Sequence, residues 1–165
     1  MNSNNIKEQL IEQLHLEKHV EGGYFCRTYQ SPLQAKNRAL MSSIYYMLTD
    51  DHPIGHFHLN QSDILHFFHL GSPIHYLTIS PEGTLESFIL GPEITAGHTL
   101  QKLVKGGYWK ASFLESGPFG LLSEAVSPGF EYADMTLGDS DLMKTLFPAL
   151  WSQIAPYVKT CPLKK

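Results

Sequence analysis

Apolar residues recur at two different spacings along the chain, and the spacing changes near Glu21 and again after Asp139. Over residues 6–14 the apolar positions are three or four apart, which is typical of a helix that docks by one face, and Ser3 or Asn4 can cap it. Beyond Glu21 the apolar runs are short and alternate with turn residues, as in a sheet. The pattern therefore predicts a helix followed by many strands.

The strand region is divided by Gly, Pro and Asp clusters at short intervals, and PEGT at 81–84 is the clearest hairpin turn. Many short strands without intervening helical periods are typical of a closed or double-sheet β architecture. The strands are expected at 24–30, 41–48, 55–59, 64–70, 74–80, 85–90, 100–104, 108–113, 120–126 and 132–137.

After Asp139 the helical spacing returns. The segments 139–147 and 148–155 are predicted to be short helices, and Pro148 is well placed in a first helical turn. Because no linker, repeat or low-complexity tract interrupts the chain, we expect one domain over residues 1–165. It divides into an N-terminal helix (1–20), a β-barrel (21–138) and C-terminal helices (139–165).

The bulk composition excludes several classes of protein. The 165 residues are 42% hydrophobic and carry a formal net charge of −4, with no basic cluster beyond Lys164 and Lys165, so a nucleic-acid partner is not expected. No apolar run is long enough to span a membrane, and the polar start lacks a signal-peptide core. Cys26 and Cys161 show no metal-type spacing, and two free thiols suit a cytoplasmic protein.

Five blocks of sequence, taken in order, resemble the cupin superfamily and within it the fifth cupin group. The blocks are EGGYFCRTYQS (21–31), SIYYML (43–48), FHLNQSDILHFFHLG (57–71), the segment 97–111 and SPGFEYADM (127–135). That group is a domain of unknown function numbered 985, often labelled predicted sugar epimerase. The resemblance implies an all-β fold, the cupin double-stranded β-helix or RmlC-like jelly-roll barrel, with short terminal helices. It also implies a homodimer and a small-molecule ligand inside the barrel.

The metal-binding motif of many cupins fits this chain poorly. In one register His58 and Asn60 take the two histidine positions, but Ile64 stands at the glutamate position and Lys110 at the last histidine position. Ile64 cannot ligate, and a protonated Lys110 repels a cation. A second register offers His56, His58 and Asp63, a two-histidine, one-carboxylate set that suits iron or manganese. We expect no cofactor and keep that set as the alternative.

A metal-free pocket would still support proton transfer. His58 matches the family block and is the candidate base, with Asp63 nearby to orient its ring. Tyr45 and Tyr46 point to opposite faces of one strand, so at most one reaches the pocket, and Tyr46 is the candidate acid.

Further residues are candidates for ligand binding. Arg27 and Lys110 would bind an anionic group, and aromatic side chains suit sugar rings or other flat ligands. The full set is Arg27, Thr28, Tyr45, His66, Phe68, Gln101, Trp109, Lys110 and Glu131.

Three functions remain open at this point. The first is a metal-independent epimerase or isomerase of carbohydrates that uses His58 as base. The second is a binding protein whose pocket recognises a small polar ligand without converting it. The third is a metal-dependent cupin that uses His56, His58 and Asp63. A barrel fold is compatible with all three, so the choice depends on which side chains converge.

Overall fold

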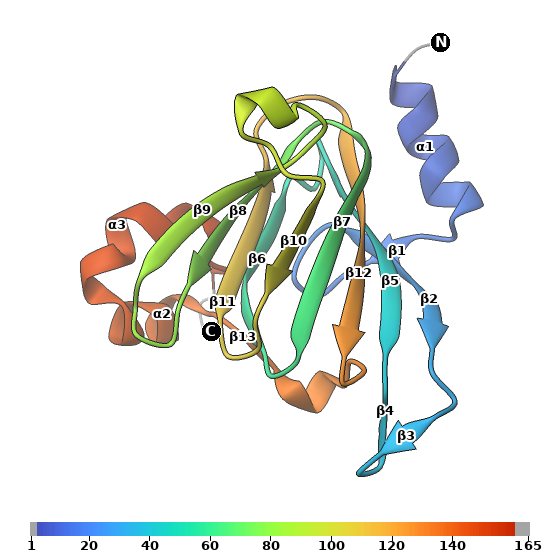
Figure 1. Ribbon diagram of the computed structural model, residues 1–165. Helices are drawn as coiled ribbons and strands as arrows, with labels where there is room; N and C mark the ends of the chain where they lie inside the picture. Colours follow the sequence, from blue (N-terminus) through green and yellow to red (C-terminus); the bar gives the residue numbers. More distant parts are fainter. Residues whose placement is uncertain (1–2, 161–165) are drawn as a thin grey trace, which may run out of the picture.

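The computed structural model describes residues 3–160, which form two facing antiparallel sheets flanked by helices (Figure 1). The α-helices are α1 (Ser3–Gln13), α2 (Ser140–Leu146) and α3 (Trp151–Ile154). The strands are β1 (Glu17–Lys18), β2 (Tyr24–Gln30), β3 (Gln34–Ala35), β4 (Arg38–Ala39), β5 (Ser42–Thr49), β6 (Ile54–Asn60), β7 (Asp63–Gly71), β8 (Ile74–Ile79), β9 (Leu85–Leu90), β10 (Gln101–Val104), β11 (Trp109–Leu114), β12 (Phe119–Ser127) and β13 (Met135–Leu137). Four 3₁₀ turns, η1 (Ile94–Ala96), η2 (Tyr132–Asp134), η3 (Pro148–Leu150) and η4 (Ala155–Tyr157), complete the order.

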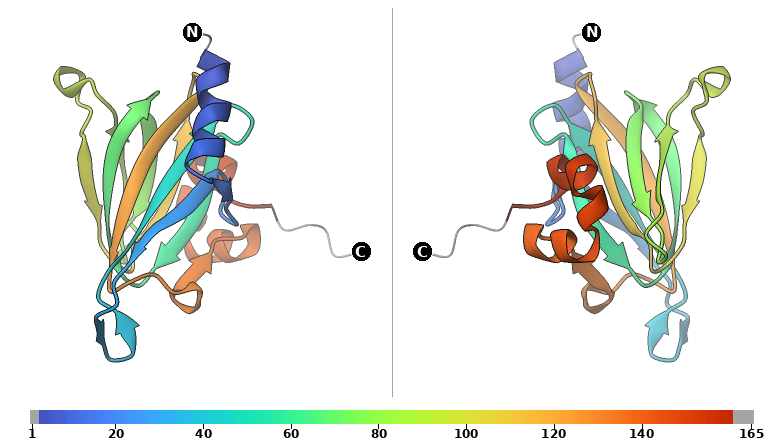
Figure 2. Two further views of the ribbon diagram at one scale, coloured as in Figure 1. Left: turned by 90° about the vertical axis from the view of Figure 1, so that its right-hand side faces the viewer. Right: turned by 90° about the vertical axis from the view of Figure 1, so that its left-hand side faces the viewer.

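The two sheets make the walls of a barrel. One sheet has the strand order β1-β2-β5-β12-β7-β10, and the other has the order β13-β6-β11-β8-β9. Helices α2 and α3 cover the outer face of the second sheet, while α1 lies beside the first (Figures 1 and 2). The small β3–β4 hairpin projects beyond the barrel (Figure 2). The all-β, double-sheet prediction is confirmed.

Alternation along β5 shows how the sequence divides the inside of the barrel from its outside. Tyr46 and Leu48 pack in the interior cluster between the sheets. Met47, between them in sequence, is fully buried on the other face, against Leu16 and the apolar residues of α1. Because successive side chains of a strand point to opposite faces, one run of apolar residues supplies both layers.

The side chains of β6 and β11 also alternate between the two faces of their sheet, and this alternation places the polar residues of the site. Phe57 and Trp109 pack outward under the C-terminal helices, against Met143. Their neighbours His58 and Lys110 therefore face the barrel interior, where both are buried. Polar residues are thus placed inside the barrel by the same alternation that docks the helices.

The structure differs from the predicted elements at a few points. The strand expected at 132–137 begins with the 3₁₀ turn η2, and only its last residues pair with β6. The two-residue strands β1, β3 and β4 were not predicted, because two residues carry no period to detect. Among the described residues no helix is long and apolar enough to cross a membrane. Cys26 is a half-buried free thiol, and Cys161 lies outside the described residues.

Candidate functional site

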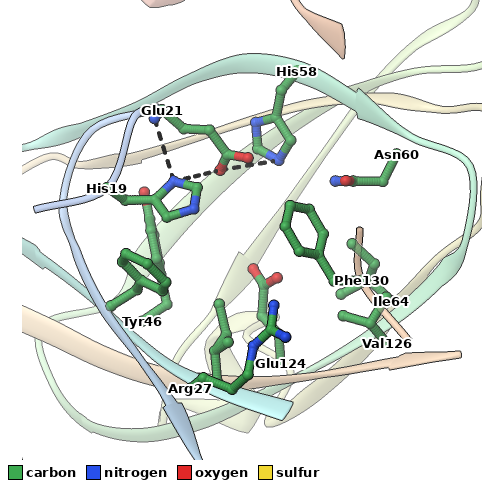
Figure 3. A pocket seen from close by; sticks show the side chains of 12 residues that line it. His19, Glu21, Arg27, Tyr46, His58, Asn60, Ile64, Glu124, Val126 and Phe130 are labelled. Atoms are coloured by element: carbon green, nitrogen blue, oxygen red, sulfur yellow. Dashed lines mark hydrogen bonds and ion pairs between the residues drawn. The ribbon is translucent and has the colours of Figure 1, made fainter. Parts of the chain in front are cut away.

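A pocket opens between the two sheets and is lined by both polar and apolar side chains (Figure 3). Its enclosed volume is about 30 Å³, room for one or two water molecules, and the count rises to about 460 Å³ when the space open to solvent is included. The lining residues are His19, Glu21, Phe25, Arg27, Ile44, Tyr46, His58, Asn60, Ile64, Glu124, Val126 and Phe130. A deeper, narrower space beneath it is lined by Glu21, Tyr46, His58, Tyr76, Lys110, Ala111, Ser112 and Glu124.

Glu21 reaches this pocket because two glycines follow it. Gly22 has a φ of 108°, and a Cβ on it would lie 2.0 Å from the carbonyl oxygen of Ile54, so only glycine fits there. This close approach holds the loop against β6, where the Glu21 carbonyl accepts from the backbone N–H of His56 at 2.7 Å. The Glu21 side chain is then buried inside the barrel, with 7% of the residue exposed.

The carboxyl of Glu21 lies between two histidine rings (Figure 3). Its Oε2 is 3.3 Å from Nε2 of His58 and 3.5 Å from Nδ1 of His19. The Nδ1 of His58 lies 2.8 Å from the carbonyl oxygen of His56. Since a carbonyl only accepts, Nδ1 carries the hydrogen of that ring and Nε2 presents a lone pair to Glu21.

His19 presents a lone pair to Glu21 as well. Its Nδ1 accepts from the backbone N–H of Glu21 at 3.3 Å, so this nitrogen carries no hydrogen in the neutral ring. Two acceptor nitrogens therefore face one carboxyl oxygen, and the contact is attractive when Glu21 carries a proton. This hydrogen-bond geometry favours a neutral Glu21 between two neutral histidines.

Burial acts in the same direction on all three groups. It raises the pKa of Glu21 to about 8, although nearby Lys110 opposes the rise. Burial, assisted by Lys110, lowers the pKa of His58 to about 3, and burial lowers that of His19 to about 4. Near neutral pH the site thus holds a protonated carboxylic acid against unprotonated imidazoles.

A second polar cluster lies below the first. The Nζ of Lys110 is 2.8 Å from Nε2 of His66 and 3.1 Å from Oε1 of Glu124. His66 donates from Nδ1 to the carbonyl of Lys102 at 3.2 Å, which leaves Nε2 to accept from Lys110. Burial alone would raise the pKa of Glu124, but Lys110 and His66 outweigh it and hold that pKa far below its usual range. The lower cluster is therefore a buried ion pair.

The structure brings part of the predicted site together. His58, Tyr46 and Arg27 line the pocket, Lys110 lines the deeper space, and His66 contacts Lys110. Tyr46 donates from its hydroxyl to the carbonyl of Gly22 at 2.8 Å, and burial raises its pKa well above the usual value.

The predicted pairing of Asp63 with His58 is wrong. Asp63 is exposed, and its Oδ1 accepts from the backbone N–H of Gly106 at 2.8 Å, which holds the loop between β10 and β11 against the start of β7. Glu21 is the carboxyl that contacts His58. The alternative metal set of His56, His58 and Asp63 is not assembled either.

Six other predicted ligand-binding residues lie away from the pocket. Trp109 faces outward, under the C-terminal helices, and Tyr45 lies on the outer face of β5 beside the ring of His69. Phe68 packs against the interior apolar cluster. The remaining three, which are exposed, are Thr28 at a register shift of β2, Gln101 on the edge strand β10 and Glu131 before η2.

The donor set does not fit a metal ion. Within residues 3–160 no group of three or more His, Cys, Asp or Glu side chains is arranged to hold one. Ile64 lines the pocket wall, and the ammonium group of Lys110 is paired with Glu124 where a cation would need a ligand. The chemistry of the site is therefore derived from its own side chains.

The barrel topology and the interior site define this molecule as a cupin. A family model described as Cupin superfamily (DUF985) matches residues 8–138, and the chain belongs to that family. An uncharacterized protein of Saccharomyces cerevisiae is 36% identical over 169 residues, which cover 90% of this chain and 84% of the yeast protein.

Two solved structures have the same fold over nearly their whole length. The crystal structure of a Shewanella oneidensis protein is 32% identical and covers 93% of this chain and 98% of its own, with a TM-score of 0.88. A hypothetical protein from Leishmania major is 26% identical and covers 92% and 97% of the two chains, with a TM-score of 0.87. The resemblance proposed from the five sequence blocks is confirmed.

Sequence reasoning missed His19, Glu21, Asn60 and Glu124 as functional candidates. Glu21 is the first residue of the EGGYFCRTYQS block. The two glycines after it could have indicated a loop whose backbone packs closely against another segment. Glu124 is partnered with Lys110, fourteen residues away on another sheet, and nothing local in the sequence indicates that contact.

The raised pKa of Glu21 predicts an unusual dependence of stability on pH. The folded protein keeps a proton that the unfolded chain releases above its ordinary pKa of 4.5, so this contribution is complete below 4.5 and is lost as pH rises through about 8. The lowered pKa values of His58 and His19 have the opposite effect. Their contribution to the free energy of unfolding is complete above pH 6.5, the ordinary histidine pKa, and is lost as the pH falls toward their folded values of about 3 and about 4. We expect the free energy of unfolding to fall by about 1–2 kcal/mol between pH 6.5 and 8.

Urea denaturation at the two pH values measures this fall. The Glu21→Gln variant, which has no carboxyl to ionise, should show little or none of it. A wild-type protein equally stable at both values would contradict the proposed protonation of Glu21.

Proposed function

We propose that this cupin binds a small hydroxylated ligand with an anionic end and moves a proton on it without a metal, as an epimerase or isomerase of carbohydrate-like compounds does. The observation that carries the proposal is the Glu21 carboxyl between Nε2 of His58 and Nδ1 of His19, inside a pocket that opens to solvent. A neutral carboxylic acid and a neutral imidazole in contact are an acid and a base in one place.

The proposed chemistry is an enolisation in which His58 is the base. When Glu21 donates its proton to the carbonyl oxygen of the ligand, the lone pair on Nε2 of His58 becomes free. That nitrogen takes a proton from the ligand carbon next to the carbonyl, and the C–H electron pair forms the C=C bond of an enol, which leaves His58 as an imidazolium beside the Glu21 carboxylate. Return of the proton to the other face or to the neighbouring carbon gives the epimer or the isomer.

Other charges around the site support this role. Burial and Lys110 lower the pKa of His58 and keep its ring unprotonated before the reaction, and Glu124 offsets them only in part. Tyr46 was the candidate acid, but its hydroxyl hydrogen is engaged by Gly22, and we propose that it holds the loop that carries Glu21. Glu21 takes the role of acid.

The pocket walls favour a compact ligand with one charged end. Phe25 and Phe130 offer aromatic faces of the kind that sugar rings contact. Arg27 lines the pocket and is exposed, and among the described residues the one hydrogen-bond partner of its guanidinium group is Gln30, to which Nη1 donates at 2.6 Å. Its remaining N–H groups are suited to a carboxylate or phosphate.

Solvent exchange tests the proposal. The protein is incubated in heavy water with α-hydroxycarbonyl compounds that carry an anionic group, dihydroxyacetone phosphate among them, and carbon-bound deuterium is followed by NMR. We expect deuterium at the carbon beside the carbonyl, with a rate that falls by about 100-fold or more in His58→Gln.

A non-catalytic binding function is the competing outcome of the same experiment. A compound that raises the melting temperature but gains no deuterium would overturn the proton transfer and favour simple binding. Exchange that is unchanged in His58→Gln would also overturn it.

A further inference from the structure

Asn60 is a buried polar residue of the pocket wall whose side-chain oxygen finds no hydrogen-bond donor within residues 3–160. It lies on β6 two positions after His58, lines the pocket and is 6% exposed. Its Oδ1 is buried with no hydrogen-bond partner among the described residues, although its backbone carbonyl accepts from Gly107. Buried polar atoms are nearly always bonded, and an unpaired one costs about 1–3 kcal/mol. An unbonded amide oxygen on a pocket wall is therefore suited to accept a hydrogen bond from a ligand.

The surroundings of Asn60 show why the protein itself supplies no partner. Figure 3 places its amide on the same side of the pocket as Ile64, Val126 and Phe130, which are apolar, and across from Arg27. An amide offers one acceptor and one donor on neighbouring atoms. Its complement on a ligand is a donor and an acceptor on adjacent carbons, as in a hydroxyl beside a carbonyl. Two adjacent hydroxyls also offer this pair, but the accepting hydroxyl would bury its own hydrogen against apolar side chains that cannot accept it.

The position of Asn60 relative to His58 fits the same ligand unit. Residues two apart on a strand share one face and lie roughly 7 Å apart along it. One small ligand can thus contact both side chains at once. An amide N–H close to the carbonyl oxygen would also stabilise the negative charge that develops there during enolisation.

We propose that Asn60 binds the α-hydroxycarbonyl unit of the ligand, with Oδ1 accepting from the hydroxyl and Nδ2 donating to the carbonyl oxygen. This inference rests on the proposed function and adds to it the substrate class and the residue that selects it. The pocket would then prefer α-hydroxycarbonyl compounds over polyols of the same size and charge.

A matched pair of probes tests the preference. Dihydroxyacetone phosphate and glycerol 3-phosphate differ in the carbonyl, and their effect on the melting temperature is compared for wild type and Asn60→Leu. We expect wild type to bind the carbonyl compound at least tenfold more tightly and Asn60→Leu to lose that preference. Equal binding of both probes by wild type, or a preference that survives in Asn60→Leu, would overturn the proposal.

The stability of the ligand-free protein gives a second, independent readout. Replacing an unpaired amide by an apolar side chain of similar size should raise the melting temperature, by about 2–4 °C. The control is Thr49→Val, because Thr49 is also fully buried but its Oγ1 accepts from His52 at 3.1 Å, so its loss should lower the melting temperature. A fall in Asn60→Leu like that of the control would make Asn60 a structural residue and refute the inference.

The two proposals fail in different ways. If deuterium is exchanged but wild type and Asn60→Leu show the same preference between the two probes, the proton transfer by Glu21 and His58 is supported and the role of Asn60 is refuted. An Asn60-dependent preference without deuterium exchange would remove the proton transfer and leave a binding site for α-hydroxycarbonyl compounds.

Discussion

Replacing Glu21 by glutamine is expected to slow hydrogen exchange between ligand and solvent by about 100-fold or more. The glutamine side chain has the same shape and can still donate from its amide to His58 or His19, so the loop and the pocket should be preserved. What it cannot do is give up or take back a proton, which is the step that frees His58. Because the pKa of Glu21 is raised to about 8, the wild-type exchange rate should also fall as pH rises above 8.

Asp63→Asn is the matched control for this prediction. Asp63 is exposed, and among the described residues its side chain accepts one hydrogen bond, from the backbone N–H of Gly106, which asparagine can keep. We therefore expect Asp63→Asn to exchange at the wild-type rate. The reverse ranking, with Asp63→Asn impaired and Glu21→Gln active, would support the sequence-based assignment of Asp63 and contradict the one made from the structure.

Replacing Lys110 by methionine is expected to lower the free energy of unfolding by about 3–5 kcal/mol. Lys110 is 3% exposed and donates to both Glu124 and His66. Methionine has a similar length but no charge, so the Glu124 carboxylate would remain buried without its cation. Urea denaturation measures the change, and Lys105→Met, at an exposed lysine, should stay within about 0.5 kcal/mol of wild type.

The double variant Lys110→Met, Glu124→Gln separates the ion pair from simple loss of packing. With both charges removed no uncompensated carboxylate is left, so the double variant should be more stable than Lys110→Met alone by about 1–3 kcal/mol. If the double variant loses as much free energy of unfolding as Lys110→Met and Glu124→Gln lose together, Lys110 and Glu124 do not stabilise each other. The description of the lower cluster as an ion pair would then be wrong.

The fold could be predicted because it depends on local patterns. Alternation along β5 and β6 separates Tyr45 from Tyr46 and Phe57 from His58, and the structure places each pair on opposite faces. Turn residues located most strand ends to within a residue or two. Such signals lie within a few neighbouring residues, where sequence reasoning is strongest.

The site could be predicted only in part because its contacts cross between distant segments. Asp63 was chosen for its closeness to His58 in sequence, whereas Glu21 reaches His58 from a loop 37 positions earlier. Trp109 adjoins Lys110 in sequence but faces the opposite side of the sheet. The alternation of side chains along each strand indicates which residues face the interior. It does not indicate which of them are in contact, because contacts depend on the strand order and on the close approach of Gly22 to β6.

The protonation of Glu21 is the central claim, and a carbon-13 NMR titration of the glutamate side-chain carboxyls tests it directly. Comparison of wild type with Glu21→Gln assigns the resonance of Glu21. The account predicts one carboxyl that titrates near pH 8 in wild type and is missing in the variant. A spectrum in which every glutamate carboxyl is ionised above about pH 5 would contradict it.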